Sequence, residues 1–251
     1  MNFLFEMTSG LDCFPEALED VALWTAWFKY MMPFLVSRSH ERYVDFLLEG
    51  LITTFIRVYE THIDDEYSGF RLDALACVGQ ALMKPEFWPR GEICAPIRHD
   101  WLTCDGQPKA SPSCNGAISA AISFCLLYLP TEQILLWTKS LFAIESVHFR
   151  AHLLVWLCAS YDCVLDEANF FSVLDQARFD IRWESSFLLA KERVDIQQEK
   201  LDEFFSAVRK FFTYGMLVLW LKQFSVVPEL AALVRDKSIA EYAADVLLAA
   251  S

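Results

Sequence analysis

The length, composition and charge of the chain exclude several classes of protein. At 251 residues the chain is near the upper limit for one hydrophobic core, so we expect a single all-helical domain over residues 1–251. Hydrophobic residues make up 55% of it, which excludes disorder over most of its length, and 8 Gly and 9 Pro are too few for a typical all-β fold. A net charge of −13 argues against nucleic-acid binding, and it suits either a basic partner or an acidic surface that only keeps an apolar protein soluble.

The first part of the chain has the apolar spacing of amphipathic helices. In residues 15–36 this spacing would place Leu18, Val21, Leu23, Trp24, Trp27, Phe28 and Met31 on one broad apolar face. Residues 40–63 repeat the pattern. A third helix is predicted from Ser68, a suitable N-cap, to about residue 83, where Pro85 stops it.

Residues 85–112 form the one long irregular segment that the sequence predicts. The segment contains five prolines and two glycines and has no amphipathic period. Loops of this length are uncommon inside compact domains and tend to be functional or mobile. We therefore expect a Pro-rich loop with a higher chance of a functional role than its neighbours.

Helical spacing returns after the loop. Helices are predicted at residues 113–129, 131–145 with Thr131 as N-cap, 146–163, 167–179 and 182–193. A long amphipathic helix is predicted over residues 197–224, followed by short helices on either side of residues 236–238. Its expected inward residues are Leu201, Phe204, Phe205, Val208, Phe211 and Phe212, and its outward residues are Lys200, Glu203 and Lys210. The sequence thus predicts an all-α fold of stacked antiparallel helical hairpins.

A weak internal repeat accompanies these helices. Three apolar helical segments begin with an apolar residue followed by arginine, at Arg71, Arg150 and Arg182. Arg71 and Arg150 are separated by 79 positions, close to two repeats of about 40, whereas Arg150 and Arg182 are separated by only 32.

Over about residues 60–195 this pattern resembles HEAT-like α-helical repeats. The resemblance implies an α-solenoid in which the three arginines are intramolecular braces bonded to nearby acidic groups. An irregular helical bundle is the alternative.

The sequence predicts a cytoplasmic protein without a membrane span. Its longest uncharged runs are interrupted by polar residues or proline, and the N-terminus lacks the basic segment and cleavage site of a signal peptide. Of its eight cysteines, Cys77, Cys125, Cys158 and Cys163 lie in or beside apolar helical stretches, where cysteine behaves as a small buried hydrophobe. That distribution fits a reducing compartment.

Two groups of residues carry an alternative metal-binding hypothesis. Cys94, His99, Cys104 and Cys114 offer thiolates and an imidazole suited to zinc, although no pair has the usual two-residue separation. Glu145, His148 and His152 would lie along one helical face, but a di-iron site needs a second Glu-x-x-His unit. Ordinary loop residues in the first group and structural roles in the second are the favoured interpretations.

The favoured function is protein–protein interaction without catalysis and without a cofactor. No GxGxxG, GxxxxGK[ST], GxSxG or HExxH motif is present. The acidic run Asp64, Asp65 and Glu66 is the candidate partner-binding segment. In size and charge the chain is similar to bacterial immunity proteins that inhibit basic toxins. The alternative is a zinc-binding helical protein or metal-dependent enzyme that uses one of the two groups above.

Overall fold

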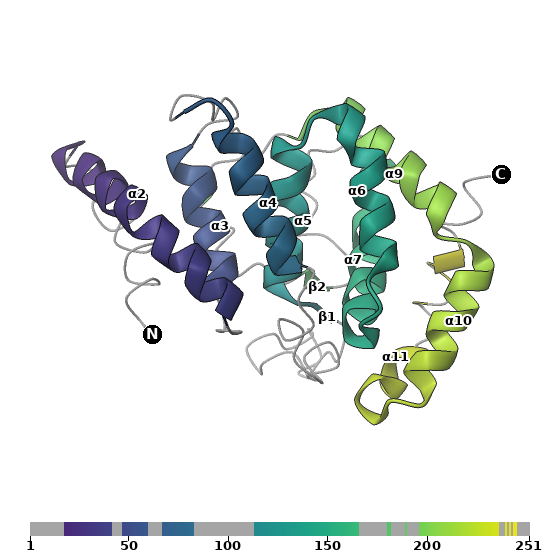
Figure 1. Ribbon diagram of the computed structural model, residues 1–251. Coiled ribbons are helices and arrows are strands. Elements are labelled where there is room, and N and C mark those ends of the chain that lie inside the picture. Colours follow the sequence, from purple (N-terminus) through teal and green to yellow (C-terminus); the bar gives the residue numbers. More distant parts are fainter. Residues whose placement is uncertain are drawn as a thin grey trace, which may run out of the picture. The chain divides into compact units, whose positions relative to one another are not determined.

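Helices account for nearly all of the secondary structure in the computed structural model (Figure 1), so the predicted all-α class is confirmed. The structure describes residues 18–41, 47–59, 67–82, 113–165, 180–181, 189, 196–235, 239, 241 and 243–244. The helices are α2 (Leu18–Glu41), α3 (Leu47–Val58), α4 (Phe70–Leu82), α5 (Gly116–Tyr128), α6 (Thr131–Ala143), α7 (Val147–Leu165), α9 (Gln198–Phe211), α10 (Tyr214–Ser225), the 3₁₀ helix η6 (Pro228–Leu230) and α11 (Ala231–Arg235).

The described elements belong to two compact units. The first contains α2, α3, α4 and α5, and the second contains α6, α7, α9, α10, η6, α11 and two short strands, β1 (Ser113–Cys114) and β2 (Asp180–Ile181). The predicted loop 85–112 and the predicted helices at 167–179 and 182–193 lie outside the described residues, apart from Leu189. The single domain and the HEAT-like solenoid stay predictions.

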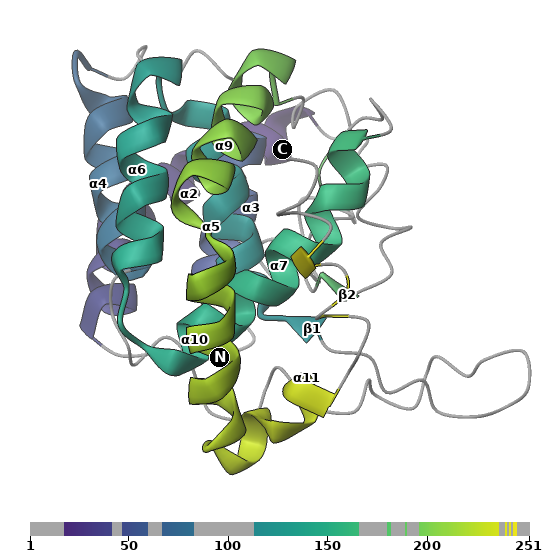
Figure 2. The same ribbon diagram turned by 90° about the vertical axis from the view of Figure 1, so that its right-hand side faces the viewer.

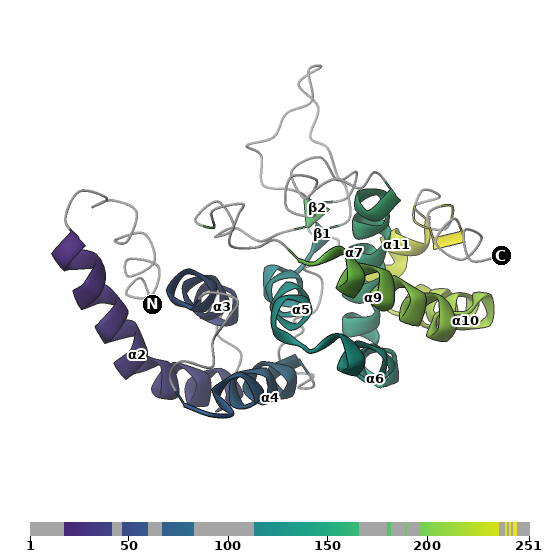
Figure 3. The same ribbon diagram turned by 90° about the horizontal axis from the view of Figure 1, so that it is seen from above.

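In the first unit, α3 and α4 each pack against both α2 and α5 (Figure 3). An aromatic cluster joins three of these helices. The ring of Phe55 lies 5.2 Å from that of Phe124, 5.7 Å from that of Tyr128 and 5.9 Å from that of Phe70. The Tyr128 hydroxyl donates a hydrogen bond of 3.2 Å to the Tyr59 carbonyl oxygen. The hydrogen bond satisfies the buried Tyr128 hydroxyl, and the ring contacts hold α3, α4 and α5 together.

Helix α4 begins at Phe70, one residue later than an N-cap at Ser68 would give. Gly69 has a φ of 97°, which a glycine adopts without the strain that a Cβ would cause. The Phe70 amide donates to the Tyr67 carbonyl oxygen at 3.1 Å and closes a turn. Ser68 therefore lies inside this turn, and the predicted N-cap position was wrong.

In the second unit, α6 and α9 pack closely and run in the same direction (Figure 2). The ring of Phe204 on α9 lies 5.8 Å from that of Trp137 on α6 and 5.8 Å from that of Trp156 on α7. Farther along, the ring of Phe142 lies 5.7 Å from that of Phe212. Trp137 thus contacts Phe204, and the later residue Phe142 contacts the later residue Phe212. Because both sequences advance in the same direction, the N-terminal ends of α6 and α9 lie at the same end of the pair.

The predicted long helix over residues 197–224 was wrong, because the chain bends by 75° between α9 and α10. Thr213 caps α10, since its hydroxyl oxygen accepts a 3.2 Å hydrogen bond from the Met216 amide. The bend brings both Phe212 and Trp220 within 5.7–5.9 Å of the Phe142 ring. In a straight helix these two residues would be about 12 Å apart along the axis.

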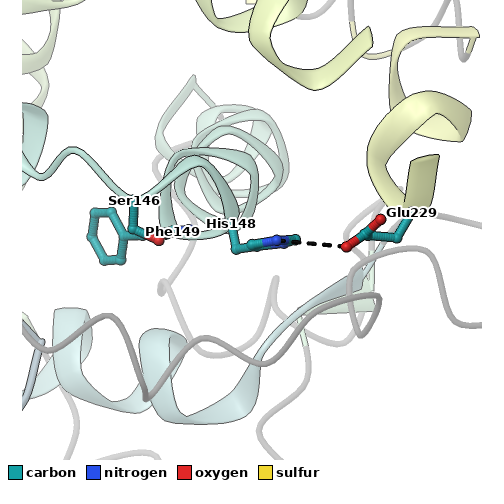
Figure 4. A network of polar contacts seen from close by, with 4 residues as sticks. All are labelled: Ser146, His148, Phe149 and Glu229. Atoms are coloured by element: carbon teal, nitrogen blue, oxygen red, sulfur yellow. Dashed lines mark hydrogen bonds and ion pairs between the residues drawn. The ribbon is translucent and has the colours of Figure 1, made fainter. Parts of the chain in front are cut away.

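Three other helix starts differ from, or refine, the predictions. Pro130 is the N-cap of α6, so Thr131 is its first helical residue instead of its cap. Residue 113 was predicted to begin a helix, but Ser113 begins strand β1, which pairs in parallel with β2. The Ser146 hydroxyl oxygen accepts a 3.3 Å hydrogen bond from the Phe149 amide and caps α7, close to the predicted start (Figure 4).

No single described helix is long and apolar enough to cross a membrane. Helices α9 and α10 reach the required length and composition only when taken together, across their 75° bend.

Candidate binding surface

Arg150 links the start of α7 to α10. Its Nε donates a 2.9 Å hydrogen bond to the Ile144 carbonyl oxygen, and its Nη1 donates a 3.0 Å hydrogen bond to Oε1 of Gln223. The guanidinium also lies 5.9 Å from the centre of the Trp220 ring. Its hydrogen-bond partners in the described part of the chain are neutral oxygens, whereas the repeat resemblance implied an acidic one.

The structure describes only some of the other predicted site residues. Arg71 is part-buried in the first turn of α4. The remaining arginine, the acidic run and most of the predicted zinc group lie outside the described residues: Arg182, Asp64, Asp65, Glu66, Cys94, His99 and Cys104.

Glu145, His148 and His152 do not come together as a metal site. Nε2 of the part-buried His148 lies 3.8 Å from Oε1 of Glu229 in η6, an ion pair when the imidazole is protonated (Figure 4). The buried His152 accepts a 3.2 Å hydrogen bond at Nδ1 from the Asn115 amide, which fixes the proton of the neutral ring on Nε2. Glu145 is exposed. Among the described residues no three His, Cys, Asp or Glu side chains form a group that could hold a metal ion.

Of the four cysteines whose side chains the structure describes, Cys114, Cys125 and Cys158 are buried and Cys77 is partly buried. Cys114 of the predicted zinc group is buried, and its thiol donates a weak 3.5 Å hydrogen bond to the Asn115 carbonyl oxygen. Burial raises the pKa of the Cys77 thiol, and the nearby charge of Asp73 raises it further. Burial also raises the pKa of Cys125 strongly. A nucleophilic thiolate needs a lowered pKa, so neither Cys77 nor Cys125 is activated.

Exposed acidic residues gather at one end of the α6–α9 pair. Glu132 lies in the first turn of α6, and Glu199 and Asp202 lie near the start of α9. Because the two helices run in parallel, these three residues lie at the same end of the pair, and we name them the acidic edge. Negative charge is favourable there, since helix N-termini carry a partial positive charge.

A line of exposed apolar side chains runs along α2. We name Leu23, Trp27, Tyr30 and Phe34 the aromatic stripe, and their exposed fractions are 59%, 48%, 66% and 61%. The Trp27 and Tyr30 rings are 6.0 Å apart, as are the Tyr30 and Phe34 rings. Their spacing of four, three and four residues places all four on one side of the helix.

The sequence prediction for this helix grouped residues that the structure separates. Leu23 and Trp27 were assigned to the same broad apolar face as Phe28, and such a face normally turns to the core. Phe28 is buried, whereas Leu23 and Trp27 are exposed on a different side of α2. The available signal was the number of large apolar residues in this segment, which is more than one face of a helix can hold.

No protein-family model, curated protein or solved structure matches the chain.

Lys29 and Arg38 are exposed basic residues of α2. Nζ of Lys29 lies 5.3 Å from the centre of the Tyr59 ring, so this side chain is directed away from the aromatic stripe. Elsewhere, Leu72 on α4 and Tyr214 on α10 are exposed by 55% and 70%, but neither belongs to a line of exposed apolar residues at helical spacing. The aromatic stripe is therefore different from the isolated exposed residues of the other described helices.

Proposed function

We propose that the chain is a non-enzymatic protein that acts by binding proteins, and that the aromatic stripe on α2 is one of its binding surfaces. The stripe is the single observation that carries this proposal. Contiguous exposed apolar patches mark interaction sites, and aromatic side chains are enriched among the residues that dominate binding energy.

The size of the stripe supports this role. At ~200 Å² per aromatic side chain, the exposed fractions of Trp27, Tyr30 and Phe34 leave roughly 350 Å² of ring surface in water. Covering that area is worth roughly 9 kcal/mol before the cost of association is subtracted. Such a gain is large enough to anchor a complex.

A basic partner is the favoured heterologous ligand. The net charge of −13 provides long-range attraction, and the acidic edge of Glu132, Glu199 and Asp202 offers a surface of matching sign. We therefore assign a basic partner to the acidic edge, and an immunity-like inhibitor of a basic toxin in the cytoplasm is the concrete form of this proposal.

The experiment is protein capture on the immobilised full chain from a lysate of the native host, at low and at high salt. The wild-type chain is compared with Tyr30→Ala in the stripe and with Tyr214→Ala, an equally exposed tyrosine outside it. The retained protein can be a host protein or a tagged second copy of the chain that is added as a probe. We expect the wild type and Tyr214→Ala to retain it and Tyr30→Ala to lose it. Equal retention by all three chains would contradict the proposal.

The acidic edge is tested in the same format with the double variant Glu199→Gln and Asp202→Asn. A basic protein retained at low salt should be released at high salt and lost by this variant, because charge attraction is screened. Retention that is unchanged by both salt and the double variant would remove the acidic edge from the proposal.

A further inference from the structure

We draw no further inference here: the strongest candidate, the surface patch formed by the aromatic stripe on α2, carries nothing beyond the binding role already proposed for it, because nothing in the structure shows what covers it.

Discussion

Replacing Phe204 by alanine should remove a large part of the stability of the second unit. The Phe204 ring is fully buried between Trp137 and Trp156, with both ring centres 5.8 Å away, and a third ring, Phe205, is 5.2 Å away. A buried Phe→Ala change costs about 3–5 kcal/mol, because it removes apolar area and leaves a cavity. The packed indole rings on both sides leave little room for collapse, so we expect a value toward the upper end.

The assay is urea unfolding followed by circular dichroism and by tryptophan fluorescence, to which Trp137 and Trp156 contribute among the eight tryptophans of the chain. A loss of about 4 kcal/mol is a large share of the 5–15 kcal/mol that stabilises a typical protein. The exposed Tyr214→Ala is the matched control and should change the free energy of unfolding by at most about 0.5 kcal/mol. A loss below about 1 kcal/mol for Phe204→Ala would refute the packing of Phe204 against Trp137 and Trp156.

Three further changes test local features of the fold. Arg150→Met should lower the free energy of unfolding by about 1–3 kcal/mol in chemical denaturation, because the Ile144 carbonyl and the Gln223 side chain lose a charged donor. An unchanged free energy of unfolding would mean that Arg150 does not link α7 to α10. Gly69→Ala should lower the stability measured by thermal melting by about 1 kcal/mol, because alanine is strained at a φ of 97°. No atom blocks the added methyl group, so the backbone strain alone sets this cost. A gain in stability would contradict this turn. The Tyr67 hydroxyl donates a 2.7 Å hydrogen bond to Asp73, which raises the pKa of the Tyr67 phenol. Asp73→Asn should therefore lower the pKa of one tyrosine in an ultraviolet titration. An unchanged titration curve would exclude this contact.

Local sequence signals predicted most of the described helices because those helices depend on local patterns. The apolar spacing of residues 131–145 and 146–163 predicted α6 and α7 to within two residues. The inward face of α9 was also largely right, since Leu201, Phe204, Phe205 and Val208 are all buried. These residues follow a 3.6-residue period that the sequence displays directly.

The features that the sequence did not predict depend on residues far apart in the chain. The bend after α9 allows Phe212 and Trp220 to reach the same ring on α6, and no local pattern reports that contact. Strand β1 exists because it pairs with β2, more than 60 positions later. Tertiary context therefore replaced the local helical preference at both places.

The candidate site shows the same limitation. The spacing of Glu145, His148 and His152 correctly places them on or beside one helix, but their partners are set by Glu229 in η6 and by Asn115 beside β1. For α2, the helical period identifies which residues share a face. It does not identify which of two apolar faces packs inside the unit, so the aromatic stripe could be recognised only from the burial of Phe28.

The proposal that the aromatic stripe is a protein-binding surface is tested most directly by titrating a captured protein against the full chain. We predict that the wild type and Tyr214→Ala bind it with the same affinity. Tyr30→Ala should raise the dissociation constant by at least about thirtyfold, the effect of losing a central aromatic anchor. A Tyr30→Ala variant that binds as tightly as Tyr214→Ala would contradict the proposal.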